Sequence, residues 1–377
     1  MLKKLLLAAT GAACIALGVA EAVQAETFEV VASGLDNPRG FTFGPDGDIY
    51  VTEAGRGGQS NRCVPSPSQI GATLCYGLTG AVTRIHDGIS ERVVTGLPSI
   101  GLSNGNASYG PHDIKFDSTG KAYVLVGFAS DARNRDNLIG NKDIGSLLAI
   151  NSLNGGSSWT KVADLAGFEL ANDPDHQGLI SNPYSFVIKD KTAYVVDAGA
   201  NDLLRVGLDG SGVTLQALFP SRIVTSPLTG KDVSMQTVPT AVTVGPDGAS
   251  YVAEFTGRPY PENAARIYRT TPGNQPEIYA GGFTQIIDLA FDTKGNLYVL
   301  EYAAKSLSLA TGGILNNAGG ALIRVAPDGT RKTIASGDEL FSPNSIVIGP
   351  DNAIYVSDYS TLAGKGQIIR FDPASLP

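Results

Sequence analysis

Residues 37–53 read NPRGFTFGPDGDIYVTE, and this stretch contains the pattern that decides the fold. A short apolar alternation leads into a Gly-Pro-Asp-Gly turn, and an aromatic and β-branched run then ends in an acid. The same setting recurs around six Tyr-Val pairs: Tyr50-Val51, Tyr123-Val124, Tyr194-Val195, Tyr251-Val252, Tyr298-Val299 and Tyr355-Val356. A unit that recurs at intervals of this length indicates one supersecondary element used as a repeat.

Each repeat is long enough for four short strands. In the first repeat, residues 40–43, 48–53, 81–85 and 92–95 have strand character and are separated by Gly/Asp turns or longer connections. Glycine (46 residues) and proline (21 residues) punctuate such runs along the whole chain, as in proteins rich in turns and strands. We therefore predict an all-β protein, a six-bladed β-propeller of four-stranded blades.

The sixth repeat stops after its third strand, because little chain follows residues 367–371. A surplus strand stands at the other end, where residues 27–33 resemble the outer strand of the first repeat. We expect this N-terminal strand to pair into the last blade, which closes the ring and leaves no open edge between blades. Residues 26–377 are then a single domain.

The first 25 residues have the features of a secretory signal peptide. Lys3 and Lys4 precede an apolar run at residues 5–19, and Val23-Gln24-Ala25 is a small-residue cleavage site. An alternative is lipid attachment at Cys14. The sequence predicts a periplasmic or secreted protein that has no membrane attachment once the signal is cleaved.

The cysteines and the net charge predict a disulfide in the mature chain and exclude one class of partner. Export makes Cys63 and Cys75, which share one Gly/Pro/Ser-rich segment, the expected partners of a disulfide. The net charge of −8 and the lack of a basic stripe exclude nucleic acid as the expected partner. We expect a monomer.

Strand order predicts which face of the propeller carries function. Connections from second to third strands, and from fourth strands to the next blade, emerge on one face, whereas the other face has only tight turns. The long connections all belong to the first kind: residues 55–79, 98–110, 127–144, 166–182, 220–237 and 303–319. We expect a small molecule or a protein partner to bind on this loop-rich face, since long loops on a rigid scaffold commonly form binding sites.

Five of the six second strands end in a carboxylate: Glu53, Asp197, Glu254, Glu301 and Asp358. One interpretation is a ring of ligands for a divalent cation such as calcium. The other is that each acid caps backbone amides or pairs with an arginine in its own blade, and the recurrence favours this structural role. The second repeat has Val126-Gly127 in place of an acid.

The residues just before the first strands differ from blade to blade, as the residues of a site should: Arg39, His112, Tyr184, Thr240, Ile287 and Asn344. His112 and Asp113 are the catalytic candidates, with His112 as a general base or metal ligand and an ordinary hydrogen-bonded histidine as the alternative. Arg39, Tyr184 and Asn344 are the ligand-binding candidates. His176, with Asp173 and Asp175, could also help to bind a cation, although a solvated acidic loop is the commoner arrangement.

The repeat core resembles NHL repeats, most closely at residues 197–206. The whole mature chain resembles the ScyD/ScyE family of exported cyanobacterial propellers, named for scytonemin biosynthesis. Stretches that carry this resemblance are Asn182-Pro183-Tyr184, residues 196–206, Val238-Pro239-Thr240 and residues 264–268. The resemblance implies a periplasmic or extracellular location and a link to a secreted aromatic pigment, and it transfers no catalytic residue.

A second resemblance is to quinone-dependent sugar dehydrogenases. Residues 37–53 are similar to their first blade, and His112 falls near their catalytic histidine, but Gly127-Phe128 stands where they have Gly-Asp. Lactonase-type propellers, which hold a channel metal with acids and an asparagine, compare through Asn344 and the five acids. These resemblances imply the alternative function, a metal- or quinone-dependent enzyme centred on His112.

Overall fold

The computed structural model describes residues 28–66, 71–309 and 319–372. The expected signal peptide, its cleavage site and Cys14 therefore lie outside the described residues. Within the described ranges, no helix has both the length and the apolar character needed to cross a membrane.

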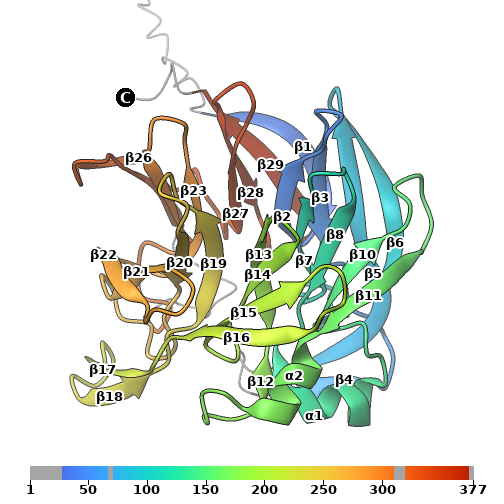
Figure 1. Cartoon of the computed structure of the whole chain (residues 1–377), viewed down its shortest axis with the longest axis horizontal. Coiled ribbons are helices and arrows are strands. Elements are labelled where there is room, and N and C mark those ends of the chain that lie inside the picture. The colour runs from blue at the N-terminus through green and yellow to red at the C-terminus, as the bar shows by residue number, and fades with distance from the viewer. Residues whose placement is uncertain (1–27, 67–70, 310–318, 373–377) are drawn as a thin grey trace, which may run out of the picture.

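The described strands form the predicted ring of six four-stranded antiparallel blades (Figure 1). Blade 1 consists of β2 (Pro38–Phe43), β3 (Ile49–Glu53), β5 (Thr73–His86) and β6 (Ile89–Gly101). Blade 2 consists of β7 (Pro111–Phe116), β8 (Ala122–Val126), β10 (Ser146–Ile150) and β11 (Trp159–Asp164). Blade 3 consists of β13 (Pro183–Lys189), β14 (Thr192–Asp197), β15 (Asp202–Gly207) and β16 (Val213–Leu218).

Blades 4 and 5 follow the same order in the chain. They consist of β19 (Pro239–Val244), β20 (Ser250–Glu254), β21 (Ala265–Thr270) and β22 (Glu277–Phe283); and β23 (Ile286–Phe291), β24 (Leu297–Glu301), β25 (Gly320–Val325) and β26 (Arg331–Gly337). The first strands of neighbouring blades contact one another, so these strands form the innermost layer around the central axis.

The last blade joins the two ends of the described chain, as predicted. It contains β27 (Ser345–Ile348), β28 (Ile354–Asp358) and β29 (Ala363–Phe371), and β1 (Glu29–Asp36) pairs antiparallel with β29. The rings of Phe28 and Phe371 lie 5.7 Å apart beside this pairing. The N-terminal strand thus supplies the outer edge of blade 6.

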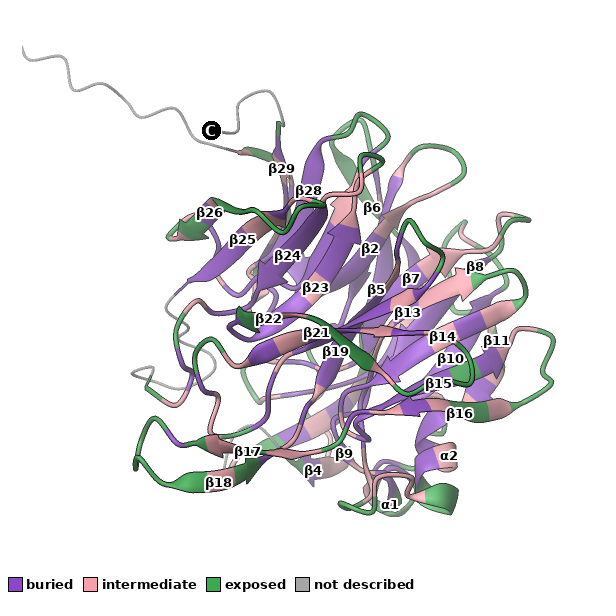
Figure 2. Ribbon diagram, turned by 60° about the vertical axis from the view of Figure 1, so that its left-hand side comes forward, coloured by how far each residue is buried: buried purple, intermediate pink, exposed green. Residues whose placement is uncertain are grey.

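The Tyr-Val pairs belong to the second strands, which lie inside their blades and pack against neighbouring blades. All five residues of β3, β8, β24 and β28 are buried, which explains why these strands are apolar almost throughout (Figure 2). The tyrosine hydroxyl donates a hydrogen bond to the aspartate of the preceding turn in five blades, as from Tyr50 to Asp46 at 2.7 Å. In these five blades the tyrosine therefore connects the second strand to its own turn.

The loop-rich face contains secondary structure that the repeat pattern did not predict. Its elements are β4 (Cys63–Pro65), β9 (Ser130–Asp131), α1 (Ala132–Asn134), the π-helical turn η1 (Arg135–Ile139), α2 (Leu165–Asn172), β12 (Ile180–Ser181), β17 (Arg222–Thr225) and β18 (Asp232–Met235). In Figure 1 the labelled members of this set gather along the lower side of the blades.

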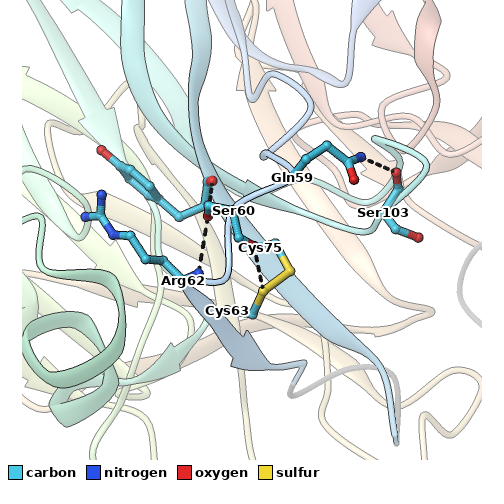
Figure 3. Close-up of a disulfide and its surroundings, with 7 residues drawn as sticks. Gln59, Ser60, Arg62, Cys63, Cys75 and Ser103 are labelled. Atoms are coloured by element: carbon cyan, nitrogen blue, oxygen red, sulfur yellow. Dashed lines mark hydrogen bonds between the residues drawn. A yellow bond between two sulfur atoms is a disulfide. The ribbon is translucent and has the colours of Figure 1, made fainter.

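The segment expected to be a loop at residues 55–79 is partly a strand extension. Strands β5 and β6 of blade 1 continue past the blade, and β4 pairs with β5 so that Cys63 faces Cys75. These two cysteines form the predicted disulfide, with a Cα–Cα distance of 4.0 Å (Figure 3). Nearby, Gln59 donates a hydrogen bond to the Ser103 carbonyl at 3.1 Å. The disulfide therefore anchors an ordered extension of blade 1.

Candidate functional site

A cavity of about 570 Å³ lies at the centre of the loop-rich face. Strand ends and long connections from several blades contribute its lining. The wall includes five aromatic residues: Tyr109, Tyr184, Phe255, Tyr260 and Tyr302. Arg39 and Arg258 are the charged residues of the described lining, which contains no Asp, Glu, His or Cys. The cavity is therefore aromatic and locally positive, in a chain whose net charge is −8.

The residues that precede the first strands meet at the floor of this cavity. Arg39, Tyr184, Thr240 and Ile287 line the cavity itself. His112 and Asn344 line a small pocket that shares Tyr184, Thr240 and Ile287 with it. The structure thus brings together the four candidates from this set, Arg39, His112, Tyr184 and Asn344.

Arg39 is buried, and no acid among the described residues pairs with it. Its Nη2 donates to the Ser108 carbonyl at 2.6 Å and its Nη1 to the Tyr184 hydroxyl at 3.5 Å. The guanidinium carbon is 5.8 Å from the centre of the Tyr109 ring, and Nε has no hydrogen-bond partner among the described residues. A buried cation is normally paired with an acid or bound to a ligand, because desolvation is costly.

Tyr184 has a neutral hydroxyl that is free to donate. Burial raises its pKa above the usual value. The hydroxyl oxygen accepts a hydrogen bond from Asn344 Nδ2 at 2.6 Å in addition to the contact from Arg39. Because both neighbours are donors, the phenolic proton remains available to a bound molecule.

His112 is a neutral imidazole with one unused nitrogen. It is 2% exposed, and its Nδ1 lies 3.0 Å from the Pro183 carbonyl, which assigns the proton to Nδ1. Burial and the charge of Arg39 lower its pKa well below the ordinary value. Nε2 has no hydrogen-bond partner in the described part of the chain. The ring centres of Tyr184 and Tyr109 are 5.0 and 5.8 Å from that of His112.

Asp113 links two blades. Its Oδ1 accepts hydrogen bonds from the Ile114 amide at 2.8 Å and from Lys115 Nζ at 2.6 Å. Its Oδ2 accepts from the Phe186 amide at 3.1 Å and from Ser185 Oγ at 3.3 Å in the next blade. These bonds describe a latch between blades 2 and 3, and a catalytic role for Asp113 stays a prediction.

The same latch recurs half-way round the ring. Asp288 accepts from Ser345 Oγ at 2.7 Å and from the Ile346 amide at 2.9 Å, which links blades 5 and 6. Burial raises the pKa of Asp288 to about 6. Gly40 occupies the corresponding position in blade 1, where a Cβ would lie 2.3 Å from Asp113 Oδ1.

Glu53, the first of the five strand-end acids, is held by polar groups close to its own strand. Its oxygens accept from the Asp36 amide at 2.6 Å and from Thr83 Oγ1 at 2.5 Å. Arg92 adds two hydrogen bonds, from Nε at 2.9 Å and from Nη2 at 2.7 Å. The carboxylate therefore connects the chain that enters blade 1 with the third and fourth strands of that blade.

Asp197 similarly caps backbone amides that lie just before the first strand and just after the second strand of its blade. It accepts from the amides of Asn182 at 2.6 Å, Gly199 at 2.9 Å and Ala200 at 3.2 Å, and from Ser181 Oγ at 2.7 Å. Of the remaining acids, Glu254 accepts a hydrogen bond from Arg222. Glu301 accepts from the Thr284 amide at 2.7 Å, and Asp358 accepts from the Phe341 amide at 3.1 Å.

Burial dominates the chemistry of these last three acids. It raises the pKa of Glu254, Glu301 and Asp358 to about 7 in each case. Among the described residues, none of the five strand-end acids belongs to a group of three metal-ligating side chains. Their contacts are those of the structural interpretation, and their role as cation ligands stays a prediction.

The described residues contain one group of three acids with metal-binding spacing, Glu169, Asp173 and Asp175. Asp202 lies close enough for Glu169 and Asp175 to raise its pKa. Glu169 and Asp202 were not among the predicted site residues. Glu169 comes from α2, which lies in a segment expected to be a loop. The acidic Asp-Pro-Asp sequence was therefore the only part of this cluster that the sequence made visible.

Comparison with known proteins gives information on the fold of this chain alone. No family model and no curated protein matches the sequence. Among solved structures, a glucose dehydrogenase is 13% identical with a TM-score of 0.53, covering 92% of this chain and 99% of that one. The PQQ-bound aldose sugar dehydrogenase of Streptomyces coelicolor is 13% identical with a TM-score of 0.51, covering 91% and 96%.

A putative gluconolactonase is similar to the same extent, at 11% identity and a TM-score of 0.50, covering 92% of each chain. At these identities the likeness extends to the arrangement of the strands. The chain thus has the β-propeller fold that these solved structures share.

Proposed function

We propose that this chain is an exported propeller that binds a small aromatic acid in the central cavity of its loop-rich face. The observation that carries the proposal is the guanidinium of Arg39, buried at the cavity floor and bonded to a carbonyl and a phenol rather than to an acid. Arginine recognises carboxylates through paired N–H donors, and Nε is a buried donor with no hydrogen-bond partner among the described residues.

The size and lining of the cavity favour a small molecule over a protein partner. Its volume of about 570 Å³ falls within the usual range for small-molecule sites. The aromatic side chains of the wall offer faces and edges on which a ligand ring can stack. Tyr184 adds a hydroxyl proton beside Arg39, so both can contact one carboxylate.

The same lining does not fit a catalytic metal or a quinone cofactor. A metal ion would meet Arg39 and no described acid on the cavity wall. A quinone such as that of the sugar dehydrogenases carries several negative charges, and the described lining offers two guanidinium groups. Phe128, which replaces the acid expected from that resemblance, is fully buried.

The resemblance to the ScyD/ScyE family supports the ligand class. That resemblance implies a role linked to a secreted aromatic pigment, whose precursors are aromatic compounds. An aromatic acid bound by an exported propeller is consistent with transport, protection or presentation of such a precursor. The family assignment is part of this proposal.

A second candidate function is proton transfer on the bound acid by His112. The neutral imidazole has an unpartnered Nε2 and lies against Tyr184, which lines the cavity. Burial and the charge of Arg39 lower its pKa, so the imidazole is neutral at pH 7, the form that a general base requires, but it is a weak base. A His112→Gln variant separates the two functions: it should abolish any turnover of a bound acid while the acid still binds.

Calorimetric titration of the mature chain tests the main proposal. We would use 4-hydroxyphenylacetate and indole-3-acetate, each beside its neutral amide. We expect an acid to bind at least about tenfold more tightly than its amide, because a hydrogen bond to a charged group contributes roughly 1.5–3 kcal/mol. The Arg39→Gln variant should lose this preference.

Arg84→Gln is the matched control, since Arg84 lies on β5 near the tight-turn face and pairs with Glu91 on the surface. It should bind the acids as the unsubstituted chain does. Circular dichroism confirms that each variant is folded. Failure of both acids to bind, or a folded Arg39→Gln variant that keeps the preference for acid over amide, contradicts the proposal.

A further inference from the structure

An acidic cluster outside the cavity has unsatisfied buried oxygens. Helix α2 carries Glu169 and ends at Asn172, and the next residue, Asp173, adopts a left-handed conformation with φ of 40°. This reversal brings Asp173 and Asp175 back beside the helix. One carboxylate oxygen of each residue lies within 4.8 Å of the others.

Two buried carboxylates in this region lack any hydrogen-bond donor. Glu169 is 1% exposed and Asp202 is 0% exposed, yet none of their four carboxylate oxygens accepts a hydrogen bond from a described residue. No lysine or arginine of the described ranges forms an ion pair with either of them or with Asp173. In contrast, the nearby Asp197 accepts four hydrogen bonds. Buried charges in proteins are paired or coordinate a metal.

We infer that Glu169, Asp173 and Asp175 bind a calcium ion. Calcium is coordinated by oxygens at about 2.4 Å, so two oxygens on one ion are at most about 4.8 Å apart. The three carboxylate oxygens of the cluster lie within this distance of one another. Three carboxylates supply hard oxygen ligands and no nitrogen or sulfur, which favours calcium over zinc or copper. Calcium also tolerates the irregular geometry of a helix end and a loop better than magnesium does.

The position of the cluster gives the ion a structural consequence. Asp175 Oδ2 accepts from Asn201 Nδ2 at 2.8 Å, and its Oδ1 accepts from the Gln177 amide at 2.9 Å. Gln177 and Ile180 belong to the wall of the central cavity. The ion therefore fixes the segment between blades 2 and 3 that forms this wall, whatever ligand the cavity accepts.

Without a cation, burial and mutual repulsion favour the protonated acids. Burial, with the charges of Asp197, Asp175 and Asp173, raises the pKa of Glu169 to about 8. The pKa of Asp202 is raised well above its ordinary value by burial and by the charges of Asp197, Glu169 and Asp175.

The test uses the mature chain stripped with EGTA and then titrated calorimetrically with CaCl₂ or MgCl₂ at pH 8. We expect one calcium site and weaker binding of magnesium. Calcium should also raise the midpoint of thermal unfolding. Glu169→Gln and Asp175→Asn should each weaken calcium binding at least about tenfold, a loss typical of a removed charged ligand.

The control is Asp209→Asn, because Asp209 is an exposed acid in the turn after β15. It should bind calcium as the unsubstituted chain does. Glu169→Gln has a second signature: it should abolish the calcium-dependent rise of the unfolding midpoint. Absence of calcium binding at pH 8, tighter binding of magnesium, or unchanged binding in both cluster variants overturns the inference.

Discussion

Gly127 lies against the imidazole of His112, because a Cβ built on Gly127 would come within 2.2 Å of both Cε1 and Nδ1 of that ring. Gly127 follows Val126, which replaces the strand-end acid in blade 2. The repeat that breaks the acid pattern is thus also the repeat that leaves room for a histidine at the floor of the cavity.

Substitution of Gly127 by alanine should disturb both stability and the cavity floor. The added methyl group must displace His112 or its strand, and such overpacking costs about 1–3 kcal/mol. Displaced His112 would also press on Tyr184, so affinity for an aromatic acid should fall. Urea unfolding and calorimetric titration measure the two effects.

Gly281→Ala is the control for this change. A Cβ at Gly281 would meet its nearest neighbour, Arg266 Cγ, at an ordinary 3.7 Å. Its effect on stability should be smaller than that of Gly127→Ala, and its effect on binding should be absent. Equal effects of the two alanines would show that the contact with His112 is not tight.

Much of the scaffold could be predicted because its signals are local. Turn glycines, alternating apolar residues and the Tyr-Val pairs depend on residues close in sequence, and the missing last strand pointed to the N-terminus. The helix α2 was missed because its eight residues have no clear amphipathic pattern in a loop context. Its burial results from tertiary packing of Leu165 and Ala166.

Closure by the N-terminal strand predicts unequal effects of two β1 substitutions. Leu35 is buried in the cluster that contains Phe41 and Ile368, whereas Val30 is exposed. Leu35→Ala should cost about 2–4 kcal/mol of unfolding free energy through loss of buried surface and a residual cavity. Val30→Ala should cost less than about 1 kcal/mol. Chemical denaturation would refute the closure if the two variants were equally stable.

Removal of the Arg92 guanidinium should be more harmful than removal of a surface arginine. Arg92 pairs with Glu53, which is buried, and with Asp36. The Arg92 side chain is half exposed, so we expect Arg92→Gln to cost on the order of 2 kcal/mol, less than loss of a fully buried pair. The control Arg84→Gln, which breaks a surface pair, should cost under about 0.5 kcal/mol. Urea unfolding near pH 7 would show the difference, and equal costs would argue against Glu53 as a structural acid.

Glu301 should make stability depend on pH. Its pKa is raised to about 7 in the folded chain from an ordinary value near 4.5, mainly by burial. Between these two values the folded state keeps the proton and the unfolded state loses it, so the contribution of Glu301 to stability falls as pH rises.

A Glu301→Gln variant can still accept the Thr284 amide but cannot titrate. Its stability relative to the unsubstituted chain should increase between about pH 5 and pH 7 and then level off. The exposed residue Glu277 provides the control substitution Glu277→Gln, which should show no such trend. Urea unfolding at intervals of one pH unit makes the comparison, and a flat difference for Glu301→Gln would contradict the raised pKa.

The candidate site could be predicted in position but not in chemistry. Strand order placed Arg39, His112, Tyr184 and Asn344 near the channel, and the structure gathers them at one floor. The absence of a carboxylate partner for Arg39 is a property of three-dimensional neighbours, which spacing along the chain does not encode. The same holds for the Glu169 cluster, whose members meet through a helix and a chain reversal.

The most direct test of the central claim is a crystal structure of the mature chain grown with the aromatic acid that binds most tightly. The account predicts electron density in the central cavity, with the ligand carboxylate within hydrogen-bond distance of the Arg39 guanidinium and the Tyr184 hydroxyl and the ligand ring against the aromatic wall. An empty cavity, or a ligand whose carboxylate points away from Arg39, would contradict it.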